Sequence, residues 1–142
     1  MTPRRAAALV LLLMAACTGA PHPTGRLDVR SPDFPDGGTI PVRFTCDGVD
    51  RVPVVEWSGG SNGDQMVLEM TDTDADGFVH WLLYDFGGAS GRLGGSTTTG
   101  TEGRNDFGTN GYRGPCPPPG DAPHRYVITL TEYRPVPSPM TA

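Results

Sequence analysis

Short segments of apolar or alternating residues, each bounded by glycine or proline, recur along the chain after residue 26. The clearest is 125–133, where Tyr126, Ile128 and Leu130 alternate with residues of the opposite face, as in a strand buried on one side. The same criteria predict strands at residues 27–31, 39–44, 52–58, 65–71, 78–86 and 125–133. No segment beyond residue 17 has the spacing of an amphipathic helix. The pattern therefore predicts a mainly β domain.

Two long segments between the predicted strands differ in composition. Residues 87–103 are rich in glycine, serine and threonine, and are expected to form a flexible connection that packs little. Residues 105–123 contain Phe107, Tyr112 and the consecutive prolines 117–119. Because proline restricts the backbone, this second loop is expected to be stiff enough to form the wall of a site.

The first sixteen residues have the pattern of a bacterial signal peptide. Arg4 and Arg5 precede an apolar run at residues 6–16, which ends in small residues directly before Cys17. A run of about eleven apolar residues is shorter than the ~20 needed for a permanent transmembrane helix. The sequence therefore predicts an exported protein from which residues 1–16 are removed.

Cys17 closes the segment Leu13-Met14-Ala15-Ala16-Cys17, which resembles the lipobox of bacterial lipoproteins. In that motif the cysteine receives a lipid and becomes the new N-terminus. The expectation is a protein anchored by lipid on the extracytoplasmic side of the cell membrane; an ordinary signal peptide, giving a secreted or periplasmic protein, is the alternative. The predicted organisation is a signal peptide at 1–16, a tether at 17–26, a β domain at 27–134 and a proline-rich tail at 135–142.

Charge excludes two classes of partner. The formal net charge is −5, the chain contains no lysine, and two of its basic residues, Arg4 and Arg5, lie in the predicted signal peptide. An acidic chain without basic clusters is unsuited to nucleic acid and to electrostatic binding of anionic membranes. Contact with a membrane should therefore come from the lipid at Cys17.

Lipidation of Cys17 would leave Cys46 and Cys116 as the remaining thiols in an oxidising compartment. These two are candidates for one disulfide. Two reduced cysteines in separate buried places remain the alternative, because a sequence does not supply the Cα separation that a disulfide requires.

Two histidines are candidates for chemistry. His80 lies inside the apolar segment 78–83, where a buried imidazole is costly unless a partner satisfies it. His124 directly follows the proline-containing loop, and Asp72 and Asp74 precede His80 at the end of another predicted strand. Taken alone, each histidine fits a hydrogen-bonded structural residue better than a ligand-binding one.

Eight segments between Leu27 and Tyr133, taken in order, together resemble the phosphatidylethanolamine-binding protein family, and more narrowly its bacterial Raf kinase inhibitor-like branch. The matching segments are Phe44-Thr45-Cys46-Asp47-Gly48, Trp57-Ser58-Gly59, Asp72-Thr73-Asp74-Ala75, Val79-His80-Trp81, Gly103-Arg104-Asn105-Asp106-Phe107-Gly108, Gly111-Tyr112, Gly114-Pro115-Cys116-Pro117-Pro118 and His124-Arg125-Tyr126. The His-Trp pair combined with Pro-Pro and His-Arg-Tyr is the most specific part.

The resemblance implies a β domain with a large central antiparallel sheet and a small pocket for phosphate-like anions at one edge. The residues that would line this pocket are Asp72, His80, Pro117, Pro118, His124 and Tyr126. Asp74 and Trp81 would lie directly behind them. An aspartate beside histidines orients them and favours their protonated form, and a tyrosine hydroxyl can donate to an anionic oxygen. The resemblance implies no cofactor.

The sequence departs from the family at residues 72–76, which read Asp-Thr-Asp-Ala-Asp where the family usually has Asp-Pro-Asp-Ala-Pro. The additional carboxylate, Asp76, would oppose an anion if it pointed into the pocket and would be harmless in solvent. With Gly77 the segment also matches the first half of a calcium loop, but the twelfth position, which needs glutamate in an EF-hand, is Leu83. A solvated acidic turn is expected, and a looser calcium site in a β domain is the alternative.

The C-terminal end is the second departure. Family members continue beyond the strand corresponding to 125–133 with a further strand and a helix, which are missing here, where residues 135–142 are short and rich in proline. Their absence is expected to uncover part of the sheet and to leave the pocket open.

These features favour a binding protein for a small anion or a phospholipid headgroup, without catalytic residues. Inhibition of a partner protein is implied by one branch's name, but no segment identifies the partner. The competing class is a metal-dependent phosphate-ester hydrolase, since two histidines and a carboxylate can hold zinc. Against it, the chain lacks His-x-x-x-His, Cys-x-x-Cys and Gly-x-Ser-x-Gly.

Overall fold

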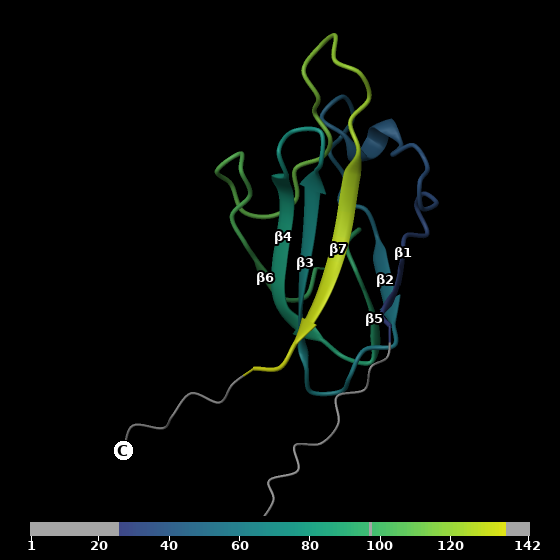
Figure 1. Ribbon diagram of the computed structural model, residues 1–142, viewed down its shortest axis with the longest axis vertical. Helices are drawn as coiled ribbons and strands as arrows, with labels where there is room; N and C mark the ends of the chain where they lie inside the picture. The colour runs from purple at the N-terminus through teal and green to yellow at the C-terminus, as the bar shows by residue number, and fades with distance from the viewer. Residues whose placement is uncertain (1–25, 97, 136–142) are drawn as a thin grey trace, which may run out of the picture.

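The computed structural model describes residues 26–96 and 98–135, whose strands form two antiparallel sheets (Figure 1). The larger sheet has the strand order β6-β4-β3-β7, and the smaller has the order β1-β2-β5. The strands are β1 Asp28–Arg30, β2 Val55–Ser58, β3 Gln65–Asp72, β4 Phe78–Gly87, β5 Ser90–Leu93, β6 Thr101–Glu102 and β7 Tyr126–Tyr133. This confirms the predicted mainly β domain with an antiparallel sheet.

The predicted signal peptide, Cys17 and nearly all of the predicted tether and tail lie outside the described residues. Within the described residues, no helix is long and apolar enough to cross a membrane.

The predicted strand at 39–44 is wrong. Residues 39–41 belong to no strand, and Val42–Phe44 form a short 3-10 helix, η1. Pro41 precedes this helix, and its carbonyl accepts a hydrogen bond of 2.9 Å from the N–H of Phe44. Because proline has no N–H to give to a ladder, a strand is disfavoured at this position.

Residues 87–103 were predicted to pack little, and this prediction is also wrong. β5 and β6 both lie in this segment, and Leu93 is completely buried. Gly91 explains why the composition was misleading, since a Cβ atom there would lie 2.2 Å from Cζ2 of Trp57. The glycine in β5 therefore makes room for the indole ring of β2 rather than marking a flexible connection.

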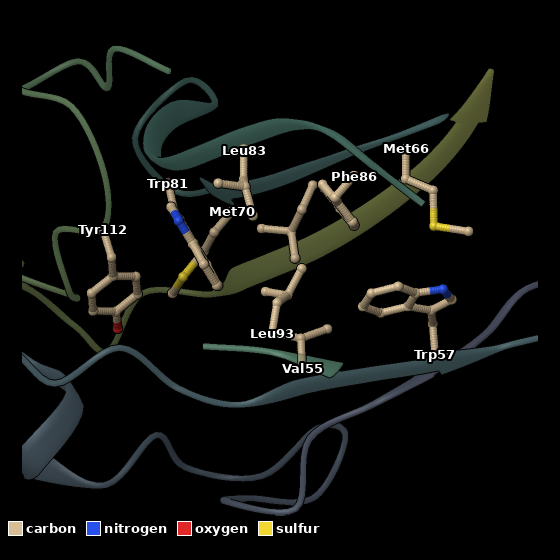
Figure 2. Packing of buried hydrophobic residues seen from close by; sticks show 10 residues of the cluster. Val55, Trp57, Met66, Met70, Trp81, Leu83, Phe86, Leu93 and Tyr112 are labelled. Atoms are coloured by element: carbon tan, nitrogen blue, oxygen red, sulfur yellow. The ribbon is translucent and has the colours of Figure 1, made fainter. Parts of the chain in front are cut away.

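The core lies between the two sheets (Figure 2). Along β3, every second residue is buried, which places Met66, Leu68 and Met70 on the core face. Asp72 occupies the next position of the same face and is only 3% exposed. The alternating burial along β3 therefore places the carboxylate of Asp72 in the interior at the end of the strand.

A β-bulge in β4 positions His80. Met70 pairs with Trp81 and Thr71 pairs with Val79, so one step along β3 corresponds to two steps along β4, and His80 is the additional residue. Consequently the adjacent residues His80 and Trp81 are both buried, which a regular alternating strand would not allow. The bulge turns His80 toward the end of the sheet that also holds Asp72.

The loops at this end come from distant parts of the chain. The β3–β4 turn, the segment at 34–48 and the long loop at 104–125 gather where β3 ends and β7 begins, at the top of Figure 1. At the opposite end of the sheet, Arg26 lies beside Gly59. The adjacent Gly60 lies close to Glu132, near the end of β7. The chain therefore enters the domain at the end away from this group of loops.

Candidate functional site

Asp72 and His124 form the centre of the candidate site. Oδ2 of Asp72 lies 2.7 Å from Nδ1 of His124, and Oδ1 of Asp72 accepts a hydrogen bond of 3.0 Å from the N–H of Asp74. The two residues meet because Asp72 pairs with Tyr126 across the β3–β7 ladder, and His124 lies two residues before Tyr126. Ladder register, rather than any local motif, creates this pair.

The environment favours the charged form of both partners. Burial raises the pKa of Asp72, but the hydrogen bonds from His124 and Asp74 outweigh burial and hold that pKa below its ordinary value. The hydrogen bond to Asp72 raises the pKa of His124 despite the opposing effect of burial. The hydrogen bond therefore favours a carboxylate paired with an imidazolium, and in that form the Nε2–H of His124 is a second donor.

His80 is held by the backbone of the long loop. Its Nδ1 lies 2.8 Å from the carbonyl oxygen of Arg113 and 3.1 Å from that of Gly114, so Nδ1 carries the hydrogen. Nε2 is consequently the ring nitrogen that can meet a ligand. Phe78, Phe107 and Tyr126 contact the imidazole edge to face, with ring centroids 5.4, 5.2 and 5.2 Å away.

The hydroxyl of Tyr126 is buried and has no hydrogen-bond partner among the described residues. A buried hydroxyl without a partner costs about 1–3 kcal/mol. Burial first, and then the negative charge of Asp72 and its nearby carboxylate as an acceptor, raise the pKa of Tyr126, so this hydroxyl stays protonated. Tyr126 therefore presents a hydroxyl beside Asp72 and His80 that makes no hydrogen bond of normal geometry there.

A cavity of about 740 Å³ opens beside these residues, between β7 and the segment at 34–47. Its wall includes Asp74, Pro117, His124 and Tyr126. Pro118 is not part of this wall, and it begins a turn in which its carbonyl accepts from the N–H of Asp121.

Comparison with known proteins agrees with this geometry. The family model for the phosphatidylethanolamine-binding protein matches residues 30–140. The chain belongs to the phosphatidylethanolamine-binding protein family. A solved member, the family homologue CT736 from Chlamydia trachomatis, superposes with a TM-score of 0.67 at 29% identity, covering 75% of this chain and 74% of that one.

Relatives in the family share more than a third of their residues with this chain over the aligned region. The protein named "Putative lipoprotein LppC" from Mycobacterium tuberculosis is 39% identical, and the match covers 73% of this chain and 54% of LppC. A UPF0098 protein from Aquifex aeolicus is also 39% identical, over 73% of this chain and 66% of its own length. The chain thus spans about half the length of LppC. None of these names states an enzymatic activity.

In this family member, Cys46 and Cys116 form a disulfide with a Cα–Cα distance of 5.4 Å. The N–H of Cys46 also donates to the carbonyl of Pro115 at 3.0 Å. Of the two alternatives that the sequence left open, the structure therefore contains the bridge. It fastens the long loop immediately before Pro117 to the segment that follows η1.

Two further contacts hold the same loop, and the sequence analysis missed both. The hydroxyl of Tyr112 donates to the carbonyl of Phe44 at 2.6 Å, and the N–H of Gly114 donates to Oδ1 of Asp50 at 2.7 Å. Asp50 had no sequence signal, because it precedes a predicted strand and its partner is 64 residues away. These contacts position the two carbonyls that bind His80.

Asn105 is a third residue that the sequence analysis did not single out. It is buried, its Nδ2–H donates to the carbonyl of Gly111, and its Oδ1 accepts from Thr109. It lies inside the segment Gly103–Gly108, one of the segments that resemble the phosphatidylethanolamine-binding protein family. That resemblance was the one signal in the sequence that could have pointed to Asn105. Asn105 closes the part of the loop that carries Phe107.

Hydrogen bonds within the protein hold the acidic turn. Asp76 is exposed and has a left-handed backbone φ of 52°, and Oδ2 of Asp74 accepts from the N–H of Arg125 at 2.6 Å. Within residues 26–96 and 98–135, no group of three or more His, Cys, Asp or Glu side chains is arranged to hold a metal ion.

Trp81 lies in the core rather than directly behind the cluster. It is completely buried and packs edge to face on Tyr112, with ring centroids 5.5 Å apart. The structure places Asp72, His80, His124 and Tyr126 close together, while Asp74 is exposed and lines the cavity beside them. Their role in binding a ligand stays a prediction.

Proposed function

We propose that this chain is an exported binding protein whose Asp72, His80, His124 and Tyr126 bind a phosphate-like anion. The anion would be free phosphate or the phosphate of a phospholipid headgroup. The observation that carries the proposal is the buried hydroxyl of Tyr126, which lacks a partner beside two histidines. A phosphate oxygen would satisfy that hydroxyl and gain charge-assisted hydrogen bonds from the imidazolium.

The charges of the site support binding of an anion as a hydrogen-bond acceptor rather than as a counterion. Asp72 compensates the charge of His124, and Asp121 lies 3.6 Å from the other ring nitrogen of His124. A strongly charged ligand therefore meets little net positive potential, and its affinity depends on directed donors from His124 and Tyr126. This arrangement suits reversible binding through hydrogen bonds.

Cys17 is proposed to carry the lipid anchor. The supporting observations are the lipobox-like segment 13–17 and the name of the relative LppC. Arg26, the first described residue, lies at the end of the domain opposite the site. A domain tethered through this end can therefore present the site away from its anchor.

The direct test is titration of the domain from residue 27 onward with inorganic phosphate, followed by NMR of the histidine and tyrosine side chains. We expect shifts at His80, His124 and Tyr126, and about tenfold weaker binding in Tyr126→Phe, because one donor to a charged group is lost. Tyr84→Phe is the matched control on β4. A parallel titration with glycerophosphoethanolamine distinguishes a headgroup from free phosphate. Absence of shifts at the cluster with both compounds would refute the proposal.

A further inference from the structure

Among the strands of residues 26–96 and 98–135, β7 is an edge strand of the larger sheet. Among the described strands it pairs only with β3, in a continuous register from Gln65 opposite Tyr133 to Asp72 opposite Tyr126. No bulge interrupts this pairing, and Tyr126–Tyr133 contain neither lysine nor proline. Strands at sheet edges usually carry such features, which prevent pairing with another chain.

The hydrogen-bonding groups of this edge can be assigned to particular residues. The N–H of Thr73 donates to the carbonyl of Arg125, directly opposite it, at 2.9 Å. Since hydrogen-bonded and non-hydrogen-bonded pairs alternate along an antiparallel ladder, Val127 and Thr129 also bond to β3. The N–H and C=O groups of Tyr126, Ile128 and Leu130 therefore point away from β3, toward the open side.

The cavity described above lies along this same edge. Besides residues 123–128, its lining includes apolar side chains from η1, from the segment before it and from the core, namely Phe34, Ile40, Val42 and Met70. A strand added to β7 would direct alternate side chains toward this apolar lining. Main-chain pairing and side-chain burial are thus available together.

The charge around the groove selects the occupant. Asp36, Asp47 and Asp74 line it, together with one arginine, Arg125, and with His124, whose charge is compensated by Asp72. Asp36 and Asp47 are exposed, and no salt bridge involves either of them within the described residues. A second copy of this acidic chain would be repelled, whereas a basic segment would be attracted.

We propose that the groove between β7 and residues 34–47 binds an extended basic segment of a partner protein. The segment adds as a strand to the free groups of Tyr126, Ile128 and Leu130. Its alternate apolar side chains enter the groove, and its basic side chains meet Asp36 and Asp47. This interaction uses the backbone of β7 rather than the side-chain donors of the cluster.

The test uses a capped eight-residue peptide in which valine alternates with arginine, measured by fluorescence anisotropy with the protein from residue 27 onward. Val42, 61% exposed at the lip of the groove, is changed to arginine, and Val49, 80% exposed outside it, receives the same change as a control. We expect Val42→Arg to weaken binding about tenfold and Val49→Arg to change it less than about twofold. Hydrogen exchange at Ile128 and Leu130 should slow when the peptide binds.

A second probe tests strand addition without altering the protein. The same peptide, N-methylated at alternate residues so that one edge lacks N–H donors, should bind about tenfold more weakly. Equal binding of both peptides, equal effects of the two valine substitutions, or no binding at all would overturn the inference. Val42-dependent binding of phosphatidylcholine vesicles without peptide binding would replace it with a membrane contact.

Discussion

Asp72 and His124 are 52 residues apart in the chain, yet a 2.7 Å hydrogen bond joins the buried carboxylate of one to the imidazole of the other. The bond connects the end of β3 to the start of β7, so it couples the strands that carry the site. Its energetic contribution depends on the protonation of both partners.

Stability should therefore vary with pH in a defined window. The pKa of His124 is raised from 6.5, so its contribution is complete below that value and is lost as pH rises through the higher pKa of the folded state. The pKa of Asp72 is lowered from 3.8, so its contribution is complete above that value and is lost as pH falls through the lower folded pKa. Urea unfolding should show the largest contribution between these reference values.

Asp72→Asn is the control for this pH dependence. The substitution keeps the size of the side chain but removes the charge that raises the pKa of His124. We expect the loss of stability above neutral pH to become shallower. An unchanged pH profile would show that the pair does not determine it.

Two tyrosines should respond in opposite ways to loss of the hydroxyl. Tyr126→Phe removes a buried group without a partner, so the free energy of unfolding without ligand should stay the same or rise by up to about 1 kcal/mol. Tyr112→Phe removes the donor to Phe44 and should lower it by about 1–2 kcal/mol. Denaturant unfolding of the two variants measures both. A large destabilisation by Tyr126→Phe would mean that its hydroxyl is bonded in the free protein.

The disulfide should make a large contribution to stability. Its cysteines are 70 residues apart in the sequence, and bridges that close loops of this size in small domains contribute about 2–5 kcal/mol. We expect the double variant Cys46→Ala and Cys116→Ala to lose this amount in urea unfolding. Thiol titration of the unfolded, unreduced domain provides an independent measurement, and two free thiols would contradict the bridge.

Lipidation can be tested by mass analysis of the protein expressed in a bacterial host. The full chain should yield a mature N-terminus at Cys17 with the mass of an added lipid, and Cys17→Ala should abolish that modification. The control is Cys46→Ala, which leaves the predicted lipobox intact. An unmodified N-terminus, or processing that is identical in Cys17→Ala, would support an ordinary signal peptide.

The sequence by itself determined the β character of the domain and most of its strands. Alternation along 125–133 predicted β7, because a strand buried on one side must alternate whatever its neighbours are. Family motifs led to Asp72, His80, His124 and Tyr126. Sequence patterns failed at 39–44, where they predicted a strand, and at 87–103, where they predicted a flexible connection. In both segments the residue composition was a poor guide to which backbone groups pair with another strand.

Only the tertiary structure decided how these residues meet. The bulge at His80, the register that sets Asp72 opposite Tyr126 and the bond between Asp50 and Gly114 all join segments distant in the chain. Periodicity reports which face of a strand is buried, but it does not specify the partner strand or its register. The buried, unpartnered hydroxyl of Tyr126 and the open edge of β7 are consequences of that pairing, so they could be found only in the folded chain.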